Sequence, residues 1–370
     1  MASIVRLFLA GDVMTGRGID QVLAQPSDPR LYEPYVRDAR DYVQLAERAN
    51  GPIPRRVEPD YIWGDALETL DRAQPDARLV NLETSVTVSD DAWPSKGIHY
   101  RMHPGNVECL TAARLDCCVL ANNHVLDFGR GGLVETLATL RAAGLGTAGA
   151  GLDAEAAAAP CAIDVARNQR VLVFGFGSET SGIPLGWAAD GEHPGVNALA
   201  ALSGAEAVRI ADSVGRVRRP GDVVVASIHW GGNWGYEIPD GQRELAHALI
   251  DAGAADVVHG HSSHHAKGIE VYRGRPVLYG CGDFIADYEG IGGREHYRSE
   301  LALMYFVDMD AADGSLASIE VAPFRVERFR LNRASSGDLM WLSDMLNREG
   351  AALGARAEIA SGDRLVLRWR

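Results

Sequence analysis

Residues 120–129, Leu-Ala-Asn-Asn-His-Val-Leu-Asp-Phe-Gly, bring together three side chains that can bind a metal or move a proton. They are the amide of Asn123, the imidazole of His124 and the carboxylate of Asp127. The apolar run before them, residues 115–120, is rich in β-branched and cysteine residues, which predicts a buried strand. Leucines at helical spacing follow, and open α/β sheets bind ligands at such strand-to-helix junctions. The alternative is that the asparagines only shape a turn that His124 caps.

Other strand-like runs in the chain end in residues of the same kind. Their last or next residues are Asp12, Glu83, His229 and the spaced pair His261 and His264. If these ends meet at one sheet edge, carboxylate, amide and imidazole ligands without thiolate suit Mn, Fe, Co or Zn. We expect one or two divalent ions, with manganese as the first choice, because a bridging carboxylate can hold two.

Some of these residues also have simpler interpretations. Asp12 can equally cap the helix that follows it. His264 and His265 are neighbours on an extended segment, so their side chains point to opposite faces and only one can join the site. The spacing favours His264. The alternative for the whole set is a collection of core and surface histidines.

Composition limits the classes of function. The chain has 370 residues, with 36 Lys and Arg against 50 Asp and Glu, and a formal net charge of −14. Such a charge disfavours nucleic acid as a partner. The five cysteines show no C-x-x-C spacing, and we find neither a signal peptide nor a membrane-length apolar run. We therefore expect a soluble cytoplasmic protein without a membrane partner, and the oligomeric state stays open.

Strand-like and helix-like stretches alternate along the chain, without repeats or a low-complexity linker. This pattern predicts one α/β domain with helices over both faces of packed sheets. We assign residues 1–330 to the catalytic domain and 331–370 to a helix and strand that pack on it. Residues 144–149 match G-x-G-x-x-G, but no strand precedes them and no acidic residue follows about twenty positions on. They therefore do not predict a dinucleotide site.

Six motifs, taken in order, resemble those of the CapA-like proteins, which are named for poly-γ-glutamate capsule synthesis. The motifs are Gly11-Asp12-x-Met14, Asn81-Leu82-Glu83, Asn122-Asn123-His124-x-x-Asp127-x-Gly129, His229-Trp230-Gly231, Gly260-His261-x-x-His264 and Gly282-Asp283-Phe284. The resemblance covers roughly residues 4–330 and places the chain in the calcineurin-like metallophosphatase superfamily. It implies a four-layer α/β/β/α sandwich with a metal centre.

The resemblance also implies roles for individual residues. Glu83 is similar to the bridging carboxylate. The ligands of one ion would be Asn123, His229 and His261, and those of the other would be Asp12 and His264. His124 would be the nearby acid or base.

Three positions depart from the patterns of these relatives. Met14 stands where calcineurin-like phosphatases have a histidine. CapA-like proteins share this change. Asn233 replaces the glutamate of His-Trp-Gly-x-Glu, and Asp283 replaces an asparagine. These changes disfavour ordinary two-metal hydrolysis of phosphate esters.

A cytoplasmic branch of the family, the lasso-peptide epimerases, fits these features better. The resemblance to this branch implies inversion of the α-carbon of a C-terminal residue of a ribosomal precursor peptide, by 1,1-proton transfer. A metal ion would grip the terminal carboxylate or amide and stabilise the enediolate. Inversion needs two bases, for which we select His296 in a glycine-rich loop and His99, oriented by Asp12. The alternative for each is a surface loop histidine.

Substrate-binding residues are expected around the same site. Arg101 lies in the polar and aromatic loop 96–104, and Trp230 and Trp234 suit an aromatic terminal side chain, although at least one tryptophan is expected to pack in the core. We also assign Asn233 and Asp283, at altered motif positions, to substrate binding.

Two other functions compete with the epimerase. One is a dinuclear hydrolase of phosphate esters or γ-glutamyl amides, with His124 as the acid. The other is a carbohydrate- or peptide-binding module that has kept a degenerate site.

Overall fold

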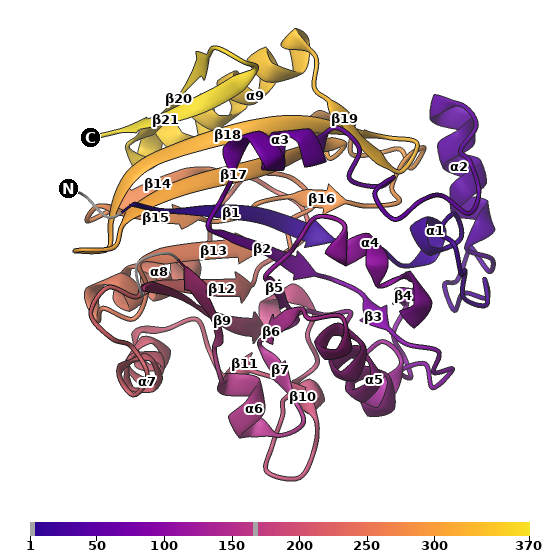
Figure 1. Ribbon diagram of the computed structural model, residues 1–370, viewed down its shortest axis with the longest axis horizontal. Helices are drawn as coiled ribbons and strands as arrows, with labels where there is room; N and C mark the ends of the chain where they lie inside the picture. The colour runs from indigo at the N-terminus through magenta and orange to yellow at the C-terminus, as the bar shows by residue number, and fades with distance from the viewer. Residues whose placement is uncertain (1–3, 166–168) are drawn as a thin grey trace.

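Two β-sheets form the centre of the computed structural model, which describes residues 4–165 and 169–370 (Figure 1). The strands of the larger sheet, in spatial order, are β20 (Ala355–Ala360), β21 (Arg364–Trp369), β18 (Ser315–Glu327), β17 (Leu301–Asp310), β1 (Ile4–Val13), β2 (Ala77–Leu82), β5 (Cys117–Val119) and β6 (Gly146–Ala148). β16 (Asp283–Ile285) pairs with β1, and β19 (Arg330–Arg333) pairs with β18.

The smaller sheet carries the second half of the expected site. Its order is β11 (Ala198–Leu199), β9 (Gln169–Ser178), β12 (Val223–His229), β13 (Val257–His261), β15 (Arg275–Leu278) and β14 (Ile269–Tyr272), with β8 (Cys161–Val165) beside β9. Two short pairs lie outside the large sheets, β3 (Ser85–Val86) with β4 (Arg101–Met102) and β7 (Ala150–Gly151) with β10 (Gly195–Val196).

Alternation of side chains along the strands produces the layers. Leu7 and Leu9 of β1 share one apolar cluster with Val173 of β9, between the sheets. Phe8, between those leucines, faces the outer cluster that includes α3 (Ala66–Ala73) and α5 (Gly129–Ala142). Phe174 faces the opposite outer cluster with α7 (Gly204–Gly215) and α8 (Asp240–Asp251). The α/β/β/α sandwich predicted from the sequence is therefore confirmed.

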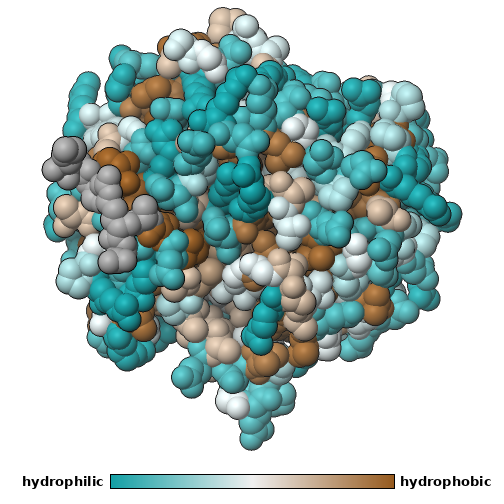
Figure 2. All heavy atoms as spheres, in the orientation of Figure 1, coloured by the Kyte–Doolittle hydropathy of each residue, from teal (hydrophilic) through white to brown (hydrophobic). Residues whose placement is uncertain are grey.

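Four more helices precede the C-terminal tail in the described ranges. They are α1 (Arg17–Asp20), α2 (Arg40–Asn50), α4 (Glu108–Thr111) and α6 (Ala154–Ala158), with 3₁₀ turns at η1 (Pro104–Asn106), η3 (Glu179–Ser181), η4 (Leu185–Trp187), η5 (Glu295–Tyr297) and η6 (Ala351–Leu353). Within the two described ranges, no helix is both long and apolar enough to span a membrane. The face drawn in Figure 2 is largely hydrophilic, with hydrophobic residues in small groups.

The C-terminal tail extends the larger sheet. α9 (Ser336–Gly350) begins with a capping box in which Ser335 and Asp338 satisfy each other's backbone groups. Its leucines, including Leu342, belong to the apolar cluster between the sheets. β21 then pairs with β18, with Leu365 opposite Val321.

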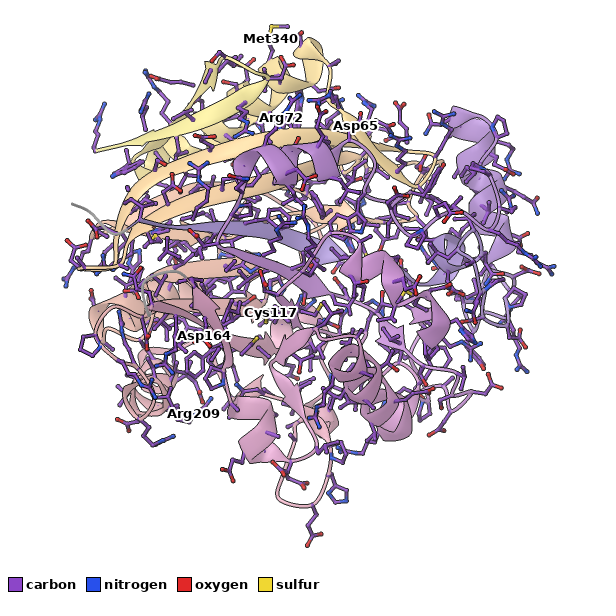
Figure 3. The ribbon with its side chains drawn as sticks, viewed as in Figure 1. Asp65, Arg72, Cys117, Asp164, Arg209 and Met340 are labelled. Atoms are coloured by element: carbon purple, nitrogen blue, oxygen red, sulfur yellow. The ribbon has the colours of Figure 1, made fainter. Side chains whose placement is uncertain are left out.

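Gly149 shows why residues 144–149 are rich in glycine although they form no nucleotide-binding motif. It has φ +85°, and a Cβ placed on it would lie 2.9 Å from the Cα of Gly175 on the other sheet. The two sheets approach each other closely at this point, so the glycine serves packing. Cys117, at the centre of Figure 3, is buried nearby, and all five cysteines are buried and free.

Candidate metal centre

The carboxyl ends of five strands lead the expected ligands into one place. β1, β2 and β5 are parallel neighbours in the larger sheet, and β12 and β13 are parallel neighbours in the smaller one. The register sets Asp12 opposite Asn81 and His229 opposite His261. The site thus lies where two sheets meet, which corrects the expectation of a single sheet edge. Strands buried on both faces read as continuous apolar runs, so the sequence does not show which sheet each one joins.

Glu83, Asn123 and His229 form what we call the ligand group. The Nε2 atom of His229 lies 3.0 Å from Asn123 Oδ1 and 3.8 Å from Glu83 Oε1. The second carboxylate oxygen, Glu83 Oε2, is buried and has no hydrogen-bond partner. Ligands about 2.1 Å from one transition-metal ion lie about 3.0–3.4 Å from each other, so the first spacing is in this range and the second is wider. Ligand atoms of Asp12, His229 and His261 also lie within 4.8 Å of one another. The buried side chains around His229 could therefore hold a divalent ion.

Asp12, Asp283 and His264 form a second set, the ion-pair group. The Nδ1 atom of His264 lies 2.9 Å from Asp283 Oδ1. Burial opposes protonation of His264, but the nearby Asp283 carboxylate outweighs it and raises the pKa of this histidine. Met14 is fully buried here, and its sulfur accepts a weak bond from the hydroxyl of Tyr288 at 3.8 Å. This set therefore contains a histidine whose surroundings favour the positively charged form.

The carboxyl groups of the site hold their protons unusually strongly. Burial, followed by repulsion from Asp283, raises the pKa of Asp12 to about 7. Burial and the charge of Asp12 raise the pKa of Glu83 well above its usual value. Burial lowers the pKa of His229 and of His261 far below that of free histidine. A bound cation would reverse the cost of these buried carboxylates, because metal binding displaces protons from its ligands.

His124 faces the ligand group with a carboxylate behind it. Its Nε2 lies 3.6 Å from Glu83 Oε1, and its Nδ1 lies 2.6 Å from Asp127 Oδ2. Lys96 contacts the other oxygen of Asp127 at 2.6 Å. Burial lowers the pKa of His124 to about 4, against the attraction of Asp127. The imidazole is therefore neutral at pH 7, with Asp127 accepting the Nδ1 proton.

A cleft of about 730 Å³ opens beside the ion-pair group. Its wall includes His264, Asn233 and Trp234, and the segment 286–300 covers much of the rest. The guanidinium of Arg294 lies 5.4 Å above the ring of Trp234. Among the described residues this arginine has no carboxylate partner, whereas Arg298 on the same wall is paired with Asp338 at 2.5 Å.

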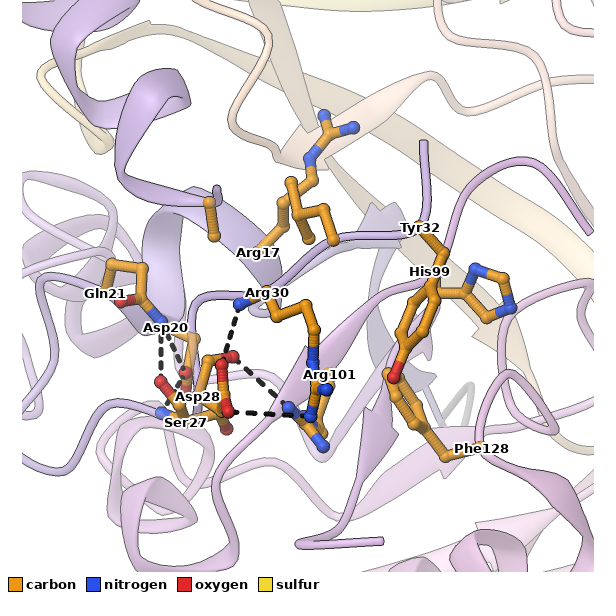
Figure 4. Close-up of a pocket in the computed structure, with 12 residues that line it drawn as sticks. Arg17, Asp20, Gln21, Ser27, Asp28, Arg30, Tyr32, His99, Arg101 and Phe128 are labelled. Carbon is orange, nitrogen blue, oxygen red and sulfur yellow. Dashed lines mark hydrogen bonds and ion pairs between the residues drawn. The ribbon is translucent and has the colours of Figure 1, made fainter. Parts of the chain in front are cut away.

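Not all the expected substrate-binding residues reach this cleft. Trp230 is buried, and its indole N–H donates to the carbonyl of Tyr279, so it packs in the core, as does Trp187. Arg101 pairs with Asp90 at 2.6 Å and lines a separate pocket of only about 10 Å³ (Figure 4). The cleft itself contains Asn233 and Trp234, with Asp283 behind His264.

The two bases expected for epimerisation lie apart. His99 is buried in the small pocket of Figure 4, with its Nε2 3.1 Å from the carbonyl of Trp93. None of the described contacts joins it to Asp12, so the expected orientation by that carboxylate is not seen. His296 is exposed on η5, with its ring 3.9 Å from that of Tyr297. Successive ring contacts through Tyr297 and Trp234 connect it to His264.

His265 packs among aromatic rings, away from the metal centre. Its ring stacks on Tyr297 with centroids 4.4 Å apart and contacts Tyr236 at 4.7 Å. It thus belongs to an aromatic cluster, while His264 faces Asp283.

Several residues that shape the site have no recognisable sequence signal. Lys96 lies in a polar loop, and only the fold brings it to Asp127. Arg17, which lines the cleft, is buried and pairs with Asp287 at 2.6 Å and with Glu33 at 2.9 Å. Because Asp287 is 270 positions away, no local pattern marks this pair.

Comparisons with known proteins place this geometry in a family. The family model described as bacterial capsule synthesis protein PGA_cap matches residues 6–288. A probable polyglutamine synthesis accessory protein of Mycobacterium tuberculosis is 48% identical over 354 residues, which are 95% of this chain and 93% of that protein. The PGA biosynthesis protein CapA of Bacillus subtilis is 28% identical over 75% of this chain and 62% of its own.

A solved structure described as a novel phosphatase from Mycoplasma pneumoniae covers 90% of this chain and 96% of its own. Its TM-score is 0.49 and its identity 12%, a likeness too slight to carry an argument.

Proposed function

The chain belongs to the PGA_cap family of bacterial capsule synthesis proteins, and we propose that it is a metal-dependent hydrolase of γ-glutamyl amide bonds. One observation carries the proposal: a histidine backed by a carboxylate, His124 with Asp127, points its free nitrogen at the ligand group. The names of the relatives, which refer to polyglutamine and PGA synthesis, support an amide of glutamate as the substrate.

The residues divide the work as follows. Glu83, Asn123 and His229 would hold the ion, with His261 beside them. When bound, the ion supplies Lewis acidity at the amide carbonyl. Neutral His124 takes the proton of the attacking water and then gives it to the leaving amine. Asp127 accepts the Nδ1–H bond throughout and stabilises the imidazolium that forms.

The cleft beside the ion-pair group is the proposed substrate site. Each γ-linked glutamate keeps a free α-carboxylate, which a guanidinium recognises well. Arg294 is the cleft cation for which the described residues provide no carboxylate. We assign it to that carboxylate, with Trp234 holding its guanidinium in place.

The test uses the full chain, loaded with Mn²⁺ and incubated with γ-linked glutamate oligomers. We expect new amino groups to appear, with a loss of activity in His124→Gln. Aryl phosphates and α-linked oligomers serve as competing substrates. Phosphate release of order 10 per second, without amide cleavage, would overturn the γ-glutamyl assignment.

A second candidate, the peptide epimerase, is favoured by one observation. Two histidines, His124 with Asp127 and His264 with Asp283, each have a carboxylate partner and border the same buried carboxylates. A 1,1-proton transfer needs such a pair of bases and only one ion. Deuterium entering the α-carbon of a peptide's C-terminal residue, without hydrolysis, would favour this candidate. His99 and His296 remain the sequence-based choices for the bases, and cytoplasm remains the compartment we propose.

A further inference from the structure

A line of buried hydrogen-bonding groups runs behind the ligand group. It starts at the carbonyl of Ala10 on β1, which lies 3.0 Å from His259 Nε2. The Nδ1 of His259 lies 3.0 Å from the hydroxyl of Ser227, and that hydroxyl lies 2.9 Å from His261 Nε2. The line ends with His261 Nδ1, which lies 2.8 Å from His229 Nδ1. These four side chains are at most 1% exposed.

The first group fixes the direction of every bond in the line. A backbone carbonyl only accepts, so His259 must carry its proton on Nε2. A neutral His259 then accepts at Nδ1, and the hydroxyl of Ser227 must donate to it. The proton of that hydroxyl is thereby used, so His261 donates from Nε2 and accepts at Nδ1. The donor to that Nδ1 is the N–H of His229.

The opposite direction of these hydrogen bonds would cost free energy. It would require His259 to carry protons on both nitrogens, and burial disfavours a charged imidazole at this position. The amide nitrogen of Asn81 has two hydrogens. One donates to Asp12 at 2.7 Å, and the nitrogen also lies 3.4 Å from His229 Nδ1. The contact of His229 Nδ1 with His261 is much shorter, at 2.8 Å, so we assign the proton of His229 to that bond.

The direction of the line determines what the ligand group offers. With its proton on Nδ1, His229 presents the Nε2 lone pair toward Asn123 Oδ1 at 3.0 Å and Glu83 Oε1 at 3.8 Å. Three lone pairs then converge with no hydrogen between them, which is a cation site. In the reversed state an N–H would point at Asn123, and the site would be closed to a metal.

We propose that Ser227 and His259 are positioning residues that fix the proton of His229, acting through His261, and so hold the ligand group in its metal-binding form. The proposal rests on the proposed metal-dependent function. It assigns His261 to the support of His229, whereas the resemblance to the family implied a direct ligand.

Matched variants separate the polarity of the line from its packing. His259→Gln keeps the polarity of the line, because the amide nitrogen can donate to the carbonyl of Ala10 and the amide oxygen can accept from the hydroxyl of Ser227. His259→Phe fills the space but has neither group. Ser227→Thr and Ser227→Ala form the corresponding pair. We expect Mn²⁺ affinity, titrated into chelator-treated protein, to fall about 10–100-fold in the breaking variants and only a few-fold in the conserving ones.

Nitrogen-15 NMR of the imidazoles provides a readout that does not need activity or metal. In the wild-type chain we expect His259 and His261 protonated on Nε2 and His229 on Nδ1. His229 protonated on Nε2 would overturn the proposal, as would equal Mn²⁺ affinity in His259→Gln and His259→Phe. Wild type that binds no ion but shows the expected tautomers would instead contradict the metal-dependent function. Because NMR uses the wild type, a variant that fails to fold does not remove the test.

Discussion

The two halves of the site contain similar residues but balance charge in opposite ways. In the ion-pair group, His264 lies 2.9 Å from Asp283, and this carboxylate raises the pKa of the histidine, which favours its positively charged form. In the ligand group, the pKa of His229 is lowered far below its usual value and Glu83 Oε2 has no partner. The ion-pair group therefore sets a histidine against its carboxyl groups. In the ligand group, Glu83 avoids a buried charge by holding its proton, which a bound cation would displace.

This difference teaches that similar residues can be arranged for different partners. Beside Asp12, the position where calcineurin-like phosphatases have a histidine is occupied by the buried Met14, and His264 lies against Asp283. Around Glu83, the neighbouring histidines have lowered pKa values and offer no positive charge. The comparison therefore predicts one tightly held ion, located in the ligand group.

The largest effect is expected from Glu83→Gln. This change removes the charged ligand while preserving volume, so ion binding should weaken by more than about 10²-fold and activity should fall to background. Asp283→Asn is the matched control in the ion-pair group, and it should keep most of the ion. Elemental analysis after dialysis measures both. Equal metal loss in the two variants would remove the distinction between the halves.

A smaller effect on activity is expected from His124→Gln. A positioned proton-transfer group contributes about 10²–10⁴-fold to the rate, and His124 has its Nε2 3.6 Å from Glu83. The metal content should be unchanged, because His124 uses its other nitrogen on Asp127. His99→Gln is the control, since His99 lies in the separate small pocket. Steady-state kinetics that rank the two variants the other way would move the acid–base role to His99.

The smallest effect concerns stability without metal. The pKa of Glu83 is raised on folding, so folded protein holds this proton at pH values where unfolded protein, with a glutamate pKa of about 4.3, has lost it. This contribution to stability therefore falls as pH rises above about 4.3. Metal-free Glu83→Gln should be more stable than wild type, and by more at pH 8 than at pH 5.

Thermal unfolding in chelator measures that difference, which should reach a few degrees, of the order that about 1 kcal/mol produces. Buried neutral histidines lose stability below about pH 6.5 in both proteins, so their effect cancels in the comparison. A difference independent of pH would contradict the raised pKa of Glu83.

The sequence predicted the strand ends well because each ends in a chemically distinctive residue after an apolar run. Asp12, Glu83, Asn123 and His229 are therefore found together. The division of these strands between two sheets was not predictable, since doubly buried strands look alike.

Some residues that we assigned to the site from the sequence are instead paired or enclosed elsewhere in the structure. Loop 96–104 looked suited to substrate because it is polar and aromatic, yet Arg101 pairs with Asp90 and His99 is enclosed beside Tyr32. The role of Ser227 was equally hidden, because it depends on contacts with His259 and His261 across neighbouring strands.

Crystallography with Mn²⁺ tests the central claim most directly. Crystals of the chelator-treated chain, soaked in Mn²⁺, would be measured for anomalous scattering. The account predicts one strong peak bounded by Glu83, Asn123 Oδ1 and His229 Nε2, with a weaker peak or none in the ion-pair group. A strong peak between Asp283 and His264 with none at Glu83, or peaks only at exposed acidic residues, would contradict it.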